Sequence, residues 1–267
     1  MSYTPVIPLG GYVGWQFLNR TLPVQQASFA QSAQIERDTQ YFKETIGSIT
    51  SAEQLVDDYR LLSVALAAFG LEDDIQSRHL IKTVIEEGPE DSSALANRLS
   101  DSRYIELAEA FQFNDPEASP AALGSAFADD IAARFTELEF ERAVGEQDEG
   151  LRLALNATRE LSIVSEGASS ENGFWYSVMG NTPLKTVFET AFGLPESFGL
   201  LDVDTQQQTL KNKSVAVFGT SDPAYFQIEE NIDNLVKTYL LRDQINQNQA
   251  SQSSASIALT LLKAARR

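Results

Sequence analysis

The chain contains no cysteine and a single histidine, His79, among its 267 residues. Without cysteine it cannot form disulfides, a thiol nucleophile, an iron–sulfur cluster or a thiolate zinc site, and its redox compartment stays undetermined. One imidazole also rules out a two-histidine zinc site and limits the choice of catalytic triads. We interpret His79, which follows Arg78 on a predicted helix, as a surface or partly packed helix residue.

Motifs for serine, nucleotide or calcium chemistry are missing as well. No G-x-S-x-G elbow marks a serine nucleophile, and the glycines of residues 10–14 lack the spacing of a phosphate-binding loop. Asp202 and Asp204 resemble the first two ligands of a calcium loop, but Gln207 replaces the glycine that its turn needs. We expect Asp204 instead to cap a helix over 205–213. We therefore predict no catalytic residue, no cofactor and no metal ligand, which favours a protein that is not an enzyme.

Basic residues are scarce, because 20 Lys and Arg stand against 38 Asp and Glu, for a net charge of −18. Such a surface repels phosphate backbones and anionic lipids, so we expect no nucleic-acid partner. Long apolar runs are missing too. Residues 1–22 have no basic residue before Arg20 and are interrupted by proline and glycine, so they predict neither a secretory signal nor membrane insertion.

What the chain does contain is helical periodicity. Thr50 or Ser51 is followed three residues later by Glu53 or Gln54, the arrangement of a capping box at a helix start. Gly70 stands where a left-handed residue ends a helix. Between them, apolar residues recur at steps of three and four and predict one core helix: Leu55, Tyr59, Leu62, Leu66 and Phe69.

Similar patterns elsewhere predict an all-α, multi-helix protein, since only Val215–Phe218 resembles a strand and one short run forms no sheet. A polar break at 167–173 is the best candidate boundary between two halves. We divide the chain into five segments: an N-terminal arm and leading helix (1–48), a helical unit (49–114), a helical hairpin connector (115–168), a second helical unit (169–242) and a polar C-terminal segment (243–267).

The two ends of the chain lack the composition of a core. Proline and glycine break every regular period in residues 1–14, which predicts an irregular arm. Residues 243–256 are almost wholly Gln, Asn, Ser and Ala, so this stretch cannot bury itself. A short apolar and basic run follows at 257–267, and its cations suit a helix C-terminus.

The second helical unit repeats the spacing of the first, which predicts an internal duplication. Leu184, Val187, Ala191, Phe192, Gly193 and Leu194 stand at the same intervals as Leu61, Val64, Ala68, Phe69, Gly70 and Leu71. Asp222 and Tyr225 similarly match Asp101 and Tyr104. Thr182 and Asp222 each precede a proline at a first helical position, where we expect them to act as caps.

Two groups of aromatic residues are candidates for protein binding. We place Trp15 and Phe17 in the N-terminal arm, which has no core of its own and must bury these rings against something. Trp175 and Tyr176 follow the polar break and could anchor a partner, since exposed Trp and Tyr dominate interface energetics. Packing between the two halves is the alternative role for this second group.

Several runs of this sequence together resemble the bacterial DUF1217 family. They are QIERD (34–38), TSAE (50–53), DYRLL (58–62), AAFGL (67–71) and LSDSRY (99–104), with Gly14-Trp15 near the start and a second AFGL at 191–194. The resemblance implies a helical protein of uncharacterised biochemistry, from a family found in alphaproteobacteria and often encoded among flagellar genes. It implies no catalytic residue.

These observations lead to two hypotheses from different classes. The first is a non-enzymatic helical protein that binds other proteins, flagellar components among them, in flagellar assembly or structure. It would be cytoplasmic, or exported with the flagellum without a cleaved signal peptide.

The alternative hypothesis is a carboxylate-dependent hydrolase of a cell-wall polysaccharide, and only the abundance of acids supports it. Adjacent acids such as Glu86 with Glu87 are more typical of solvated helix faces. The oligomeric state stays open.

Overall fold

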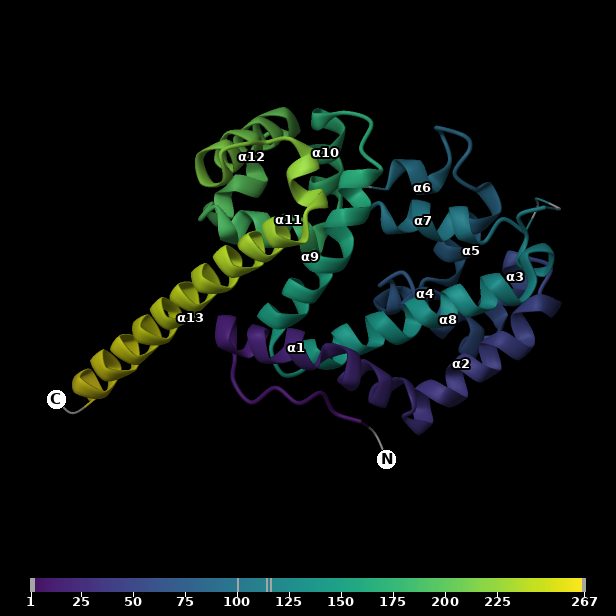
Figure 1. Cartoon of the computed structure of the whole chain (residues 1–267), viewed down its shortest axis with the longest axis horizontal. Helices are drawn as coiled ribbons and strands as arrows, with labels where there is room; N and C mark the ends of the chain where they lie inside the picture. Colours follow the sequence, from purple (N-terminus) through teal and green to yellow (C-terminus); the bar gives the residue numbers. More distant parts are fainter. Residues whose placement is uncertain (1–2, 100, 114, 116, 266–267) are drawn as a thin grey trace. The chain divides into compact units, whose positions relative to one another are not determined.

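The computed structural model of the chain describes residues 3–99, 101–113, 115 and 117–265, with side chains up to residue 249 (Figure 1). It contains α-helices and short 3-10 helices, and no strand occurs among the described residues. The expected all-α class is therefore confirmed. Val215–Phe218, the one strand-like run, forms the last turn of a helix.

The chain divides into two compact units. Unit 1 comprises Met1–Ile7 and Leu18–Gln147, and unit 2 comprises Pro8–Phe17 and Asp148–Arg267. The division falls between Gln147 and Asp148 rather than in the polar break at 167–173, because the helix that precedes this break packs with the helices that follow it. The two helices of the expected hairpin connector accordingly belong to different units.

Unit 1 has its core where its fourth and eighth helices meet the second. Leu61, Leu62 and Phe42 are fully buried there, together with Phe140 of the eighth helix. The elements that lie in this unit, the first only from Leu18 onward, are α1 (Gly11–Ala30), α2 (Ala33–Thr45), η1 (Ile46–Ser48), α3 (Ala52–Asp57), α4 (Tyr59–Ala67), η2 (Glu72–Gln76), α5 (Arg78–Glu87), α6 (Leu95–Arg98), α7 (Arg103–Ala110) and α8 (Pro120–Gly145).

Unit 2 is built around α11 (Thr182–Ala191), which packs against α9 (Glu149–Glu166) and α13 (Glu229–Ala265). Trp175, Phe188 and Phe226 are fully buried in its core. Besides the start of α1, its elements are α9 (Glu149–Glu166), α10 (Glu171–Gly180), α11 (Thr182–Ala191), η3 (Glu196–Leu200), α12 (Val203–Phe218), η4 (Pro223–Gln227) and α13 (Glu229–Ala265).

The core helix expected between Thr50 and Gly70 is two helices, α3 and α4, which meet at Asp58. The Asp58 backbone is extended, and its carboxylate accepts the N–H groups of Arg60 and Leu61, both at 3.0 Å. The Tyr41 hydroxyl donates to the same carboxylate at 2.6 Å. An aspartate that bonds to the backbone in this way offers an alternative to the helical ladder, so α3 ends and α4 begins. The cap expected at Ser51 is confirmed by its bond from the Gln54 N–H.

Both helices with the Phe-Gly-Leu ending stop in the same way. Gly70 has φ +67° and Gly193 has φ +63°, the left-handed conformation that favours glycine. The following leucine N–H donates five residues back in each case, from Leu71 to Leu66 and from Leu194 to Glu189, both at 2.9 Å. This is the Schellman arrangement of a helix end. Internal duplication of the whole unit stays a prediction, since similar helix ends also arise independently.

Two of the expected helix caps are wrong by one or two residues. Asn181, not Thr182, caps α11 by accepting the Leu184 N–H at 3.1 Å. Asp202, not Asp204, caps α12 by accepting the Thr205 N–H at 2.9 Å. In each case the capping residue has the extended backbone that places its side chain over the first turn. The expected cap at Asp222 is confirmed, on the short helix η4.

The N-terminal arm is shorter than expected and is docked. Residues 11–14 already belong to α1, and residues 3–7 are tied to the part of this helix that lies in unit 1. The buried Gln25 amide accepts the Val6 N–H at 2.7 Å and donates to the Val6 carbonyl at 3.2 Å. Gln147 donates to the Pro5 carbonyl at 2.9 Å. Side-chain amides thus satisfy backbone groups that no regular element pairs.

Replacing Gln25 with alanine is expected to release the arm. The change leaves both backbone groups of Val6 without their partners, at a cost of about 1–3 kcal/mol. Hydrogen exchange of residues 3–7 should accelerate while the rest of unit 1 keeps its protection. Gln16→Ala, an exposed change on the same helix, is the control, and equal exchange in both variants would contradict the docking role of Gln25.

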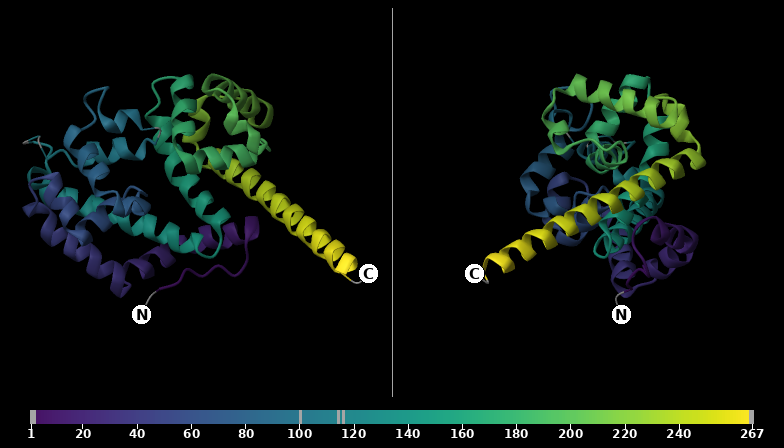
Figure 2. Two further views of the ribbon diagram at one scale, coloured as in Figure 1. Left: turned by 180° about the vertical axis from the view of Figure 1, so that it is seen from behind. Right: turned by 90° about the vertical axis from the view of Figure 1, so that its left-hand side faces the viewer.

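The polar C-terminal segment continues α13 as one helix to Ala265. Side chains from Ile245 to Gln249 are exposed, in line with a stretch that cannot bury itself. Figure 2 shows this part of α13 leaving the other helices of unit 2. None of the helices, over the residues described, is both long enough and apolar enough to cross a membrane.

Candidate functional site

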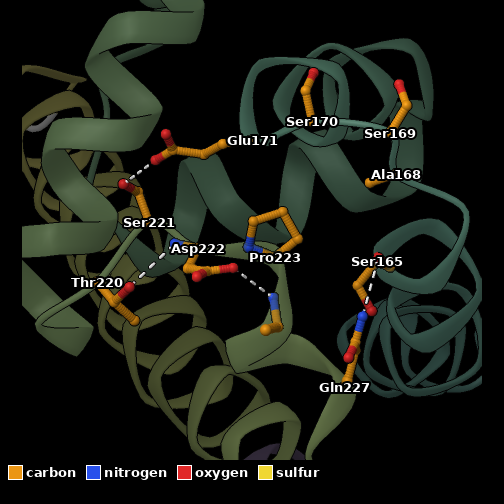
Figure 3. Close-up of a pocket in the computed structure, with 11 residues that line it drawn as sticks. Ser165, Ala168, Ser169, Ser170, Glu171, Thr220, Ser221, Asp222, Pro223 and Gln227 are labelled. Carbon is orange, nitrogen blue, oxygen red and sulfur yellow. Dashed lines mark hydrogen bonds between the residues drawn. The ribbon is translucent and has the colours of Figure 1, made fainter.

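A polar groove of about 600 Å³ lies in unit 2 between the start of α10 and the loop that leads into η4 (Figure 3). Two chain segments build it, 165–171 and 220–227. Hydroxyl side chains and two acids, Glu171 and Asp222, dominate its lining. The polar break seen in the sequence at 167–173 therefore forms one wall of the groove.

Glu171 is held by two donors at the edge of the groove. The Ser221 hydroxyl donates to one carboxylate oxygen, as Figure 3 shows, and the Lys211 ammonium lies 3.0 Å from the other. The hydrogen bond from Ser221 and the charge of Lys211 lower the pKa of Glu171. A carboxylate stabilised in its ionised form is unsuited to donate a proton, which is the first task in acid-assisted hydrolysis.

Asp222 has a structural role in the same groove. Its carboxylate accepts the Ala224 N–H at 3.0 Å, and its own N–H donates to the Thr220 hydroxyl at 3.0 Å (Figure 3). These bonds cap η4 and fix the loop. Both acids of the groove thus hold the fold together. Among the residues that the structure describes, no cluster of three or more acids and histidines could hold a metal ion.

The acid limb of the stability curve should depend on Glu171. Because its folded pKa lies below the unfolded value of about 4.3, its contribution is present above that pH and is lost as the pH falls through the folded pKa. Glu171→Gln should therefore be less stable than the wild type at neutral pH and should lose less stability on acidification. Urea unfolding across this range measures both effects. Glu166→Gln, at an exposed acid of α9, is the control, and matching curves for the two variants would contradict the assignment.

Both tryptophans predicted to bind partners are in the core. Trp15 is 3% exposed and lies in α1, not in the arm, while Trp175 is completely buried. The Trp175 ring packs on Phe174 and Phe188, with ring centres 5.0 and 5.3 Å away, and its N–H donates to the Ser221 carbonyl at 3.1 Å. Trp175 is therefore a core residue, as the alternative expected, but these contacts lie within unit 2 and not between the two halves. Phe17 is half-buried.

Tyr176 is exposed and belongs to an apolar surface that sequence patterns did not reveal. Its hydroxyl donates to Asp204 at 2.6 Å, which places Tyr176 beside the first turn of α12. Three apolar residues next to this turn are exposed as well, Leu200 by 87%, Leu201 by 44% and Val203 by 56%. We call Tyr176, Leu200, Leu201 and Val203 the Leu200 patch. The apolar residues of 198–203, interrupted by Gly199 and Asp202, were its one signal, and such residues more often enter a core.

The loop that carries the Leu200 patch is held from beneath. Phe198 is buried, and so is Gln206, whose amide donates to the Leu201 carbonyl at 2.7 Å and to the Gly199 carbonyl at 3.4 Å. Because Phe198 is buried and the carbonyls of Gly199 and Leu201 are hydrogen-bonded to Gln206, the Leu200 side chain points to solvent. The exposure of this side chain is therefore a property of an ordered loop.

The margin of the Leu200 patch is acidic. Glu196, Asp202 and Asp204 lie within or next to the run that forms it, and residues 196–210 contain no basic residue. An exposed apolar group with a rim of one charge favours binding of an apolar segment that carries the opposite charge.

Comparison with known proteins places the chain in a family. A crystal structure of an Agrobacterium tumefaciens protein, solved in a structural genomics programme, superposes with a TM-score of 0.73 at 25% identity, covering 91% of this chain and 99% of that one. No curated protein matches this chain significantly. The family described as "Protein of unknown function (DUF1217)" matches residues 68–226, more than half of the chain. This protein therefore belongs to the DUF1217 family, as its sequence motifs predicted.

Proposed function

We propose that this protein is a non-enzymatic protein-binding protein and that the Leu200 patch is part of its binding surface. The observation that carries the proposal is the 87% exposure of Leu200 on an ordered loop. Burying a leucine side chain yields about 1.5–3 kcal/mol, and an ordered loop loses little conformational entropy on binding. The alternative, hydrolysis, has no comparable support, because both acids of the polar groove are occupied by hydrogen bonds and an ion pair that hold the fold.

The partner that suits this surface is apolar and basic. Three acids at the margin of the patch and the net charge of −18 attract such a segment from a distance and repel acidic competitors. For the cellular context we propose flagellar assembly or structure, on the ground of the gene context that the family resemblance implies. The DUF1217 description itself names no function.

Affinity capture from a flagellated host tests the binding proposal. Wild-type protein should recover partners that Leu200→Asp loses, because a carboxylate in the centre of the patch prevents burial of the apolar surface. Val24→Asp is the matched control, since Val24 is 72% exposed but lies in unit 1. Equal recovery by all three proteins would contradict the proposal, and so would recovery of no partner by a protein that also does not associate with itself.

The flagellar context has its own test. A deletion strain should lose motility or assemble abnormal flagella, and the wild-type gene should restore both. Complementation with Leu200→Asp should fail while Val24→Asp succeeds. A deletion strain with normal motility and normal flagella would reject this context without bearing on the binding surface.

A further inference from the structure

We infer that the occupant of the Leu200 patch is the segment 257–267 of a second copy of this chain, so that copies associate head to tail. The inference rests on the proposed protein-binding function and names the partner of the same surface. Three observations carry it: the chemistry of the patch, the chemistry of this segment and the course of α13.

The segment has the composition that the patch selects. From Gln244 onward the chain contains no acid, although the protein as a whole carries 38. Large apolar residues stand at 257, 259, 261 and 262, and three cations follow at Lys263, Arg266 and Arg267. An apolar run with basic residues beside it complements an apolar patch with an acidic rim.

The segment 257–267 cannot reach the Leu200 patch of its own chain. Helix α13 begins at Glu229 and is continuous to Ala265. At 1.5 Å per residue, residue 257 lies about 42 Å along the axis from the helix start. The start of α13 packs on α9 and α11, and Figures 1 and 2 show its C-terminal part extending away from these helices and from α12. The segment therefore reaches a Leu200 patch only on another copy.

Such a contact joins two different surfaces and leaves one of each free. The second copy presents its own Leu200 patch, and the first presents its own C-terminal segment. A contact of this heterologous kind adds copies without limit unless the rotation closes a ring. The expected product is a series of dimers, trimers and longer chains whose length rises with protein concentration.

Sedimentation velocity of the full-length protein over a concentration series tests the inference. The wild type should show concentration-dependent growth. Leu200→Asp should weaken association about tenfold or more, the loss expected for one buried leucine. The triple change Lys263→Glu, Arg266→Glu, Arg267→Glu should weaken it comparably, and Val24→Asp should behave as the wild type. Association should also fall between about 0.1 M and about 1 M salt, where the screening length shortens from about 10 Å to about 3 Å.

A mixture of the two defective variants is the decisive sample. Leu200→Asp retains a good segment, and the triple variant retains a good patch, so one contact per pair is restored. The mixture should form dimers and nothing longer. Three results would overturn the inference: a wild type that stays monomeric, association that both variants leave unchanged, or a mixture that stays monomeric.

We expect each variant to keep its helices, because every substituted position is exposed or lies in the C-terminal segment, and circular dichroism checks this.

Sedimentation uses the pure protein alone, whereas capture from a lysate reports other proteins. A monomeric wild type that still recovers partners through Leu200 would refute self-association and leave the proposed function standing. Self-association without any other captured protein would limit the binding function to copies of this chain.

Discussion

Replacement of Trp175 by alanine is expected to remove about 3–5 kcal/mol from the free energy of unfolding of unit 2, the usual cost of deleting a large buried aromatic side chain. Trp175 is completely buried, and its ring contacts Phe174, Phe188 and Phe226, with centres 5.0 to 6.3 Å away. Loss of the indole leaves a cavity and also leaves the Ser221 carbonyl without its donor. Because most domains have only about 5–15 kcal/mol of stability, this single change brings unit 2 close to unfolding.

Chemical denaturation with fluorescence detection measures this loss, since Trp15 stays in unit 2 as the reporter. Tyr176→Ala, the neighbouring residue on α10, is the control: its side chain is 41% exposed, and we expect less than about 1 kcal/mol. Trp175→Phe should fall between the two because it keeps most of the packing and loses the hydrogen bond. Equal losses at positions 175 and 176 would refute the assignment of Trp175 to the core.

The two Phe-Gly-Leu helix ends should each lose about 1–2 kcal/mol when the glycine becomes alanine. Gly70 and Gly193 both have positive φ, where a Cβ approaches the following carbonyl oxygen. At Gly193 the added Cβ would also stand 2.8 Å from the Arg242 guanidinium, but this is the flexible end of a side chain and can move. The backbone conformation therefore accounts for most of the expected loss at both positions.

Hydrogen exchange resolved along the sequence separates the two effects, because Gly70 lies in unit 1 and Gly193 in unit 2. Each variant should lose protection in its own unit. Gly199→Ala is the control, since its φ is not positive and its Cβ would meet nothing within 4 Å. If Gly199→Ala costs as much as the other two, the left-handed conformation is not the cause.

The contrast between Ser51 and Asp58 shows how far local patterns reach. The spacing of Ser51 and Gln54 predicted a helix start that the structure confirms, because a cap depends on residues three apart. Asp58 breaks the expected helix, and here the apolar stripe of residues 55–69 gave no warning. Its carboxylate also accepts a bond from Tyr41, seventeen positions earlier in the chain. An apolar periodicity of three and four residues cannot reveal a hydrogen bond between residues so far apart in the sequence.

The candidate site divides in the same way. Tyr176 was a predicted binding residue and is exposed, whereas its neighbour Trp175 is core. On a helix, adjacent residues face about 100° apart, so the sequence offers two rings and only packing decides which one is covered. Leu200 was not predicted at all, because exposure of a leucine depends on Phe198 and Gln206 holding the loop beneath it.

The sequence by itself determined the helical class, the family, the position of the glycine stops and the absence of thiol chemistry, since these depend on composition, short spacings and residue types. Only the tertiary structure decided that acids of this chain, which has no cysteine and a single histidine, serve as helix caps and ion-pair partners. It also decided that both tryptophans are buried in the core and that the loop around Leu200 exposes apolar side chains. Burial is a property of residues brought together from distant parts of the chain, and a pattern of neighbours does not contain it.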